Sequence, residues 1–184
     1  MNKTKKVLTI IIVTIILIGV LLTVGIGNYF VNYAIAKNGD GGNREIKEDS
    51  KIEVLSEDEQ LIEDNRKYAS ESAQNWASNI VNKKVEIKAD DGVTLRGSEY
   101  ITDENTDNWA IVLHGYRAEP KSVLTIGEHF SEKGYNVLVP SMRACADSDG
   151  EFVGMGWLDK DDLKCWINLV LSENSNAKII LHGS

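Results

Sequence analysis

Three short, mostly apolar runs constrain the fold of this chain more than any other feature of its sequence. They are WAIVL at 109–113, YNVLVP at 135–140 and AKIIL at 177–181. Runs of this length with little alternation of polar and apolar residues are typical of strands buried on both faces of a sheet. The sequence therefore predicts three interior strands.

The segments between these runs have helical periodicity. A first helix is predicted at 121–133, with Pro120 near its start and Gly134 after its end, and a second helix begins near Asp159. Apolar residues recur in them at intervals of three and four positions: Val123, Ile126, Gly127 and Phe130, then Leu163, Trp166, Ile167 and Val170. Helices with one apolar stripe are expected to cover the faces of a sheet.

An antiparallel hairpin is predicted before the first run, around the turn ADDG at 89–92. In its second strand, Val93, Leu95, Gly97 and Glu99 alternate with Thr94, Arg96, Ser98 and Tyr100. The order is therefore a hairpin followed by β-α-β-α-β. That order predicts an α/β fold with a mostly parallel sheet and right-handed crossovers.

The N-terminal part has a different character. Residues 7–27 contain neither charge nor proline, and three lysines lie in 1–6. A helix of this length spans the ~30 Å core of a bilayer, and the lysines favour a cytoplasmic N-terminus. We expect a basic cytoplasmic tail (1–6), a transmembrane signal-anchor helix (7–27) and an extracytoplasmic remainder. The alternatives are a signal peptide cleaved near the AIA at 34–36 and a buried helix of a soluble protein.

Two segments connect this helix to the strands. Residues 28–56 are predicted to be a juxtamembrane segment and a linker. Residues 57–81 are predicted to form a helix that packs on the domain at 84–184. Ser56 and Glu59 have the spacing of a capping box at its start.

Charge and cysteine content narrow the function classes. Residues 37–184 hold 17 basic and 28 acidic residues, a formal charge of −11. A domain with this excess of acid is not expected to bind nucleic acid. Cys145 and Cys165 are expected to be two thiols, although a disulfide between them is compatible with an extracytoplasmic location.

Ligands of open parallel sheets bind beyond the carboxyl ends of the strands. Three segments leave those ends here: HGYRAEP (114–120), SMRACADSDGEFVGMGW (141–157) and HGS (182–184). A glycine directly after a strand allows a sharp turn, and backbone amides in such a turn can stabilise an oxyanion. The alternative is that each His-Gly pair only closes a strand.

Four stretches together resemble the α/β-hydrolase family, in particular its membrane-anchored bacterial serine hydrolases related to S9 peptidases. They are WAIVLHGYRAEP, GYNVLVPSMRACADSDG, GMGWLDKDDLKCWI and KIILHGS. The resemblance covers about residues 85–184. It implies a serine hydrolase that cleaves an ester or an amide of a small molecule or peptide through an acyl-enzyme. No metal or cofactor is implied.

The resemblance also assigns roles to residues. The nucleophile of the family lies in a G-x-S-x-G elbow, in which Gly183 matches the first glycine and Ser184 the second position. The nucleophile would then be position 185, and the triad partners would follow it. This chain is therefore expected to be the N-terminal part of a hydrolase and inactive alone. The backbone N–H of Tyr116, after His114 and Gly115, is expected to be one oxyanion donor.

Other nucleophiles fit less well. Ser184 itself would need a glycine at 182, where the chain has His182, and Cys145 has no assignable base. The stretch RACADSDG departs from the R-G-H-G-x-S-x-G of the family, with Ala144, Cys145 and Ala146 in place of Gly-His-Gly. The nearby acids read as loop and helix-start residues: Asp147, Asp149, Asp161 and Asp162.

A different class of function remains open, namely a membrane-tethered module that binds a partner without catalysis. Against this alternative, the last strand is expected to be an exposed apolar edge, so that the isolated chain is expected to be unstable.

Overall fold

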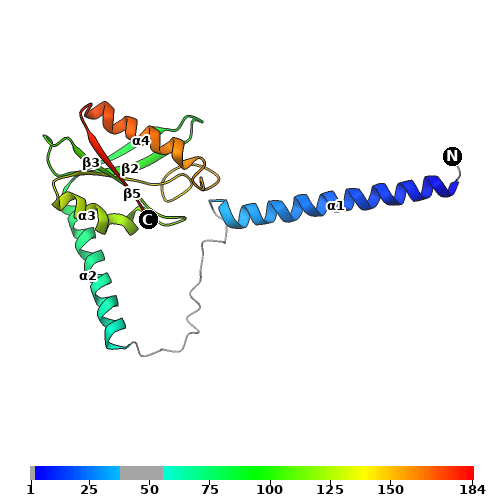
Figure 1. The fold of residues 1–184 in the computed structure, drawn as a ribbon, viewed down its shortest axis with the longest axis horizontal. Helices are drawn as coiled ribbons and strands as arrows, with labels where there is room; N and C mark the ends of the chain where they lie inside the picture. The colour runs from blue at the N-terminus through cyan, green and yellow to red at the C-terminus, as the bar shows by residue number, and fades with distance from the viewer. Residues whose placement is uncertain (1–2, 38–55) are drawn as a thin grey trace. The chain divides into compact units, whose positions relative to one another are not determined.

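A computed structural model of the chain describes residues 3–37 and 56–184 (Figure 1). It consists of two compact units, Met1–Arg44 and Glu45–Ser184. Most of the predicted linker, at 38–55, and the first two residues of the predicted basic tail lie outside the described residues. The two units are considered separately.

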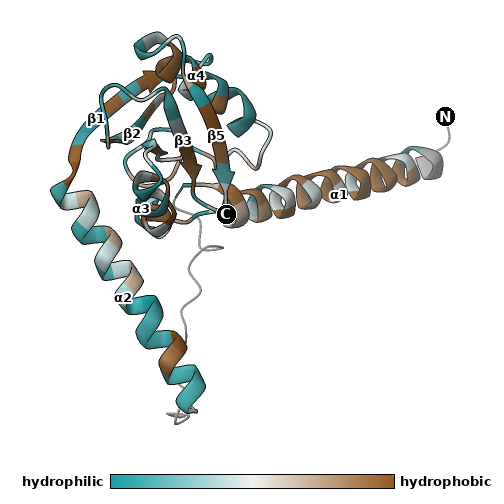
Figure 2. Ribbon diagram, turned by 60° about the vertical axis from the view of Figure 1, so that its left-hand side comes forward, coloured by the Kyte–Doolittle hydropathy of each residue, from teal (hydrophilic) through white to brown (hydrophobic). Residues whose placement is uncertain are grey.

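The first unit is one long apolar helix, α1 (Lys3–Ile35). Its segment Lys6–Ile35 is long and apolar enough to cross a membrane, and most of its ribbon has hydrophobic colouring (Figure 2). None of the most apolar window of this segment is buried. The hydroxyls of Thr14 and Thr23 donate to the carbonyls of Ile10 and Gly19, at 2.9 Å each. Its length, composition and N-terminal place fit either a membrane anchor or a signal sequence.

The second unit is built on a five-stranded sheet with the order β1-β2-β4-β3-β5. The strands are β1 (Val81–Lys88), β2 (Thr94–Ile101), β3 (Asn108–Leu113), β4 (Asn136–Pro140) and β5 (Lys178–Gly183). The pairs β1–β2 and β2–β4 are antiparallel, whereas β3 runs parallel to β4 and β5. The α/β class is confirmed. The sheet, expected to be mostly parallel, is mixed, because the hairpin joins it through β4.

Helices cover both faces of this sheet. The helix α2 (Glu57–Asn79) lies on one face with α3 (Leu124–Glu132), which a short 3-10 turn, η2 (Pro120–Val123), precedes. The helix α4 (Asp159–Glu173) lies on the other face. Gly134 follows α3 with a φ of +80°, the left-handed conformation expected of a glycine after a helix.

The core alternates between the two faces of β3. Ala110 and Val112 pack toward α2 and α3, while Trp109 and Ile111 pack toward α4. All four are nearly inaccessible to solvent, as are all five residues of β4. The first two apolar runs are therefore interior strands, as predicted.

The third run differs. β5 lies at the end of the sheet order, and Ile180 and Leu181 remain 39% and 48% exposed. The prediction that residues 177–181 are buried on both faces is therefore wrong, whereas the expectation that the last strand is an exposed apolar edge is confirmed. The physical reason is that β5 pairs with β3 on one side only, so that its own apolar residues form an edge.

The helix α2 begins at the capping box that the sequence indicated. The Ser56 N–H donates to Glu59 Oε2 at 2.9 Å, and the Glu59 N–H donates to Ser56 Oγ at 3.3 Å. Near the other end, Trp76 packs on Tyr100 and donates from Nε1 to Ser131 Oγ at 3.2 Å. The helix ends at Asn79, and β1 follows it after a single residue.

Candidate functional site

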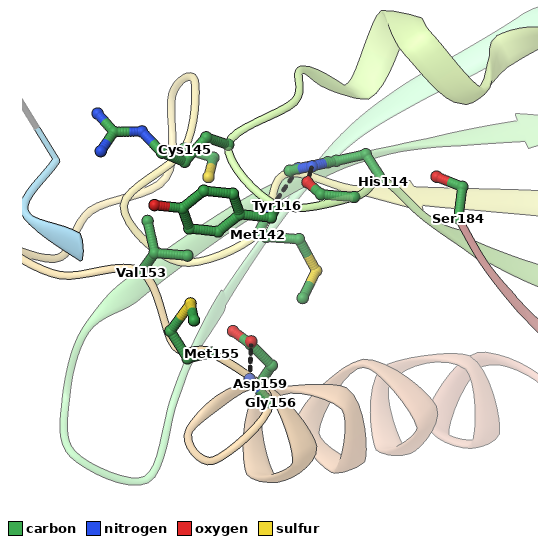
Figure 3. Close-up of a pocket in the computed structure, with 11 residues that line it drawn as sticks. His114, Tyr116, Met142, Cys145, Val153, Met155, Gly156, Asp159 and Ser184 are labelled. Atoms are coloured by element: carbon green, nitrogen blue, oxygen red, sulfur yellow. Dashed lines mark hydrogen bonds between the residues drawn. The ribbon is translucent and has the colours of Figure 1, made fainter. Parts of the chain in front are cut away.

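A pocket of about 320 Å³ lies at the carboxyl ends of β3, β4 and β5 (Figure 3). All three segments singled out from the sequence contribute to its wall. The lining residues are His114, Gly115, Tyr116, Arg117, Met142, Cys145, Val153, Met155, Gly156, Asp159 and Ser184. The structure therefore brings the His114–Tyr116 turn and Ser184 to one cavity.

His114 connects two of these segments through its ring. The Met142 N–H donates to His114 Nε2 at 3.0 Å, and His114 Nδ1 lies 3.0 Å from the Gly115 carbonyl oxygen. Because Nε2 accepts a hydrogen bond, the proton of the neutral ring is on Nδ1, which donates to that carbonyl. Burial lowers the pKa of His114, although Gly115 and Asp159 act in the opposite direction. Both nitrogens of a neutral ring are thus used by the backbone.

Gly115 brings the turn after β3 close to the end of β5. A Cβ at position 115 would lie 2.9 Å from the Ser184 carbonyl oxygen, a separation that real Cβ atoms do not tolerate against backbone. The Ser184 N–H donates to the Leu113 carbonyl at 3.3 Å, which fixes the same approach. A side chain at 115 would force the two segments apart.

Tyr116 and Gly183 complete the set of residues predicted from the sequence. The Tyr116 ring is about half exposed and points into the pocket beside Cys145 and Val153 (Figure 3). Gly183 is the last residue of β5 and leads into Ser184. Cys145 is buried in the pocket wall and is not joined to Cys165, which lies on α4.

The base of the 141–157 loop is held by an ionic cluster that sequence reasoning missed. Arg143 donates from Nε and Nη2 to both carboxylate oxygens of Asp162, at 2.9 and 2.7 Å, and from Nη1 to Asp91 at 2.7 Å. Arg143 and Asp162 are 5% and 4% exposed. Arg143 lowers the pKa of Asp91 by its hydrogen bond. Asp162 is therefore one half of a buried, bidentate ion pair in addition to being a helix-start acid.

The same loop departs from the family pattern in sequence but keeps a backbone that suits glycine. Ala144 and Ala146, which replace the two glycines of the pattern, have φ values of 59° and 42°. Gly150 also has positive φ, and a Cβ there would lie 2.9 Å from Arg143 Cγ. The two alanines therefore adopt a left-handed conformation that is unfavourable for any residue with a Cβ.

The other acids near the pocket have structural partners. Asp159 Oδ2 accepts from the Gly156 N–H at 2.7 Å, whereas the buried Asp159 Oδ1 has no hydrogen-bond partner among the described residues. Asp149 pairs with Arg96, and Asp161 pairs with Lys160 and Lys164. Within residues 3–37 and 56–184, no three His, Cys, Asp or Glu side chains come together as a metal site.

Solved structures show where this fold occurs. An esterase of Pyrococcus furiosus matches with 28% identity and a TM-score of 0.53, over 60% of this chain and 42% of that one. DcsB in complex with its substrate analogue matches with 27% identity and a TM-score of 0.50, over 56% of this chain and 37% of that one. An α/β hydrolase of Vibrio vulnificus matches at 20% identity, over 70% of this chain and 40% of that one, with a TM-score of 0.46.

The chain thus shares its fold with the esterase over 60% of its length, and it spans less than half the length of each of these structures. No family model and no curated protein matches its sequence.

Proposed function

We propose that this chain is part of a membrane-anchored serine hydrolase that cleaves carboxylic esters outside the cytoplasm. One observation carries the proposal. A pocket at the carboxyl ends of the parallel strands is lined by both the His114–Tyr116 turn and Ser184, on a fold shared with an esterase of 28% identity. Ligands of open α/β sheets bind at this edge.

The proposed reaction is acyl transfer in two steps. A serine that follows Ser184 attacks the ester carbonyl and gives its proton to a histidine base. The Tyr116 backbone N–H donates to the oxyanion. The tetrahedral intermediate expels the alcohol, which takes that proton, and leaves an acyl-serine. Water then attacks the acyl carbon, and the acid is released with the serine regenerated.

The pocket favours an apolar acyl group and argues against His114 as the base. Met142, Cys145, Val153 and Met155 supply most of the side-chain wall. His114 has no ring nitrogen left for a substrate, since both make hydrogen bonds with the backbone. Its proposed role is to position the turn that carries the Tyr116 amide. Nucleophile and base then both lie outside residues 1–184, and the chain alone is inactive.

The anchor is proposed from the first unit. The apolar segment of α1 is longer than the cleavable apolar segment of a typical signal peptide, and the lysines of residues 3–6 lie at the start of the helix. Tyr29, Phe30 and Tyr33, near its end, suit the interface between lipid and water. The proposed arrangement is a cytoplasmic N-terminus with residues 37–184 outside. Its proposed partners are the membrane, through 7–27, and a small ester or peptide substrate, with no nucleic acid.

The test compares this chain with the product of its gene read past the codon for Ser184. We expect Ser at 185 and Gly at 187. We also expect p-nitrophenyl butyrate hydrolysis, abolished by a fluorophosphonate, in the longer product only. The matched control is the longer product with that serine changed to alanine. Fluorophosphonate-sensitive turnover by the 184-residue chain would contradict the proposal, as would a gene without Ser-x-Gly at 185–187.

A further inference from the structure

A second pocket lies at the opposite end of the parallel strands, where β3 and β4 begin. Its volume is about 250 Å³, and it is lined by Lys83, Glu99, Ile101, Glu104, Thr106, Trp109, Asn136, Glu173 and Asn174. Trp109 and Asn136 are at the starts of β3 and β4, and Ile101 is at the end of the antiparallel β2. We call it the amino-edge pocket. The parallel strands end at the other side, where Tyr116 and Ser184 lie.

Two side chains of this pocket have buried polar atoms without a hydrogen-bond partner. They are Glu99 Oε1, an acceptor, and Trp109 Nε1–H, a donor. Glu99 is 1% exposed and Trp109 is 4% exposed. Buried polar groups are nearly always paired in native proteins, so that two such groups of opposite type, on residues that line one cavity, leave room for an occupant or a bound water. That occupant must both donate and accept.

The charge around Glu99 favours a cationic donor. Glu99, Glu104 and Glu173 line the amino-edge pocket with a single base, Lys83. Lys83 already bonds Glu173 and lies 3.5 Å from Glu99 Oε2. Glu173 is in the last turn of α4, where the helix dipole adds further negative potential. A second positive charge at Glu99 Oε1 would offset this excess.

We propose that the amino-edge pocket binds a small ligand with an ammonium group and an oxygen acceptor, the chemistry of an amino alcohol. The ammonium donates to Glu99, and the oxygen accepts from the Trp109 indole. Lys83, on Glu99 Oε2, and Glu104 are exposed charged side chains of the same pocket. The site is independent of the proposed hydrolase function, because it shares no residue with the pocket at the carboxyl ends of β3, β4 and β5.

Proton binding at Glu99 gives the site a pH signature. Burial and the neighbouring Glu173 raise the pKa of Glu99 to about 7, although Lys83 acts in the opposite direction. The charged groups that face it are Lys83 on β1, Glu173 on α4 and Glu104 after β2. An ammonium ligand needs the ionised carboxylate, so that binding should strengthen as pH rises through about 7.

The test uses the full chain in detergent micelles with ¹⁵N-labelled tryptophan. Its four indole N–H resonances are recorded while ethanolamine is added at pH 8. We expect one resonance to shift and saturate, and the Trp109→Phe variant assigns it. Ethylammonium lacks the oxygen acceptor and should bind at least about tenfold more weakly, and ethylene glycol lacks the charge and should cause no saturable shift.

The carboxylate is tested by Glu99→Gln, which should weaken ethanolamine binding at least about tenfold. Glu151→Gln is the matched control, an exposed acid outside the pocket, and should change binding less than threefold or so. If Trp109→Phe fails to fold, loss of the shift in Glu99→Gln identifies the site. No saturable shift with any probe would mean that the pocket holds water only and would overturn the proposal. Equal binding of all three probes would also overturn it.

Discussion

Each end of α4 lies at a cluster of charged side chains that includes a buried carboxylate. The two clusters differ in how many of their buried polar atoms have hydrogen-bond partners. At the N-terminal end, Asp162 receives two hydrogen bonds from Arg143 in the helix turn that favours an acid. At the C-terminal end, Glu99 shares Lys83 with Glu173 and keeps one oxygen without a partner. The first cluster fits a purely structural role, whereas the second retains capacity to bind a proton or a ligand.

The largest effect is expected from breaking the satisfied cluster. Arg143→Ala should lower the free energy of unfolding by about 3–5 kcal/mol, because Asp162 would be left buried without its partner. Urea unfolding of the chain in micelles, followed by tryptophan fluorescence, measures this loss. The control is Arg66→Ala on α2, whose ion pair with Glu63 is largely exposed, with an expected change under about 0.5 kcal/mol. Equal losses of unfolding free energy in both variants would mean that the buried ion pair stabilises the fold no more than the exposed one.

The unsatisfied cluster should respond to pH and to the loss of charge. Because the folded-state pKa of Glu99 is raised from 4.5 to about 7, its contribution to stability is fully present below pH 4.5 and is lost as pH rises through 7. Glu99→Gln should remove this slope and stabilise the chain at pH 8 by up to about 3 kcal/mol. Unfolding midpoints from pH 4 to 8 measure it, with Glu104→Gln as the control. A slope that survives in Glu99→Gln would assign the titration to another group.

His114, at the carboxyl ends of the strands, should make the free energy of unfolding depend on pH with the opposite sign. Its pKa is lowered, so that its contribution is present above its ordinary value of 6.5 and is lost as pH falls toward the folded-state pKa. His114→Phe would leave the Met142 N–H and the Gly115 carbonyl without this partner, at a cost of about 1–3 kcal/mol. Thermal unfolding at pH 7.5 tests this. The exposed His129→Phe is the control, and a loss as large there would contradict the assignment.

The smallest effect on stability is expected from a substitution in the 141–157 loop. Ala146 is exposed at a φ of 42°, so that Ala146→Gly should relieve backbone strain and stabilise by up to about 1 kcal/mol. The same change at Ala69, in the middle of α2, should destabilise by about 1 kcal/mol. Opposite signs of the two shifts in melting temperature are the expected result. A destabilising Ala146→Gly would mean that the left-handed conformation carries no strain.

Much of the fold could be predicted because its signals are local. The apolar runs at 109–113 and 135–140 predicted β3 and β4, and the alternation in β2 placed Glu99 on the same face as Leu95. The residues of β5 resemble those of an interior strand, so that its exposure was expected only from its place as the last strand. Burial there depends on which strands lie beside it.

The site was predicted less completely, because its contacts join distant positions. The His-Gly and Gly-Ser turns pointed to the carboxyl ends of the strands, where the structure has a pocket. The partners of Arg143 lie 52 and 19 residues away in sequence, and no spacing rule connects them. His114 contacts the backbone amide of Met142, a group that every position except proline has, so that the sequence contains no signal for it.

The close approach at Gly115 has a consequence for how such a sequence can vary. With the Ser184 carbonyl 2.9 Å from the place of a Cβ, no single substitution at 115 fits unless the end of β5 also moves. Relatives that keep this path of the chain should therefore keep glycine at 115. Those that lost it should show a change at the end of β5 as well, so that the two positions, 69 residues apart, would vary as a pair.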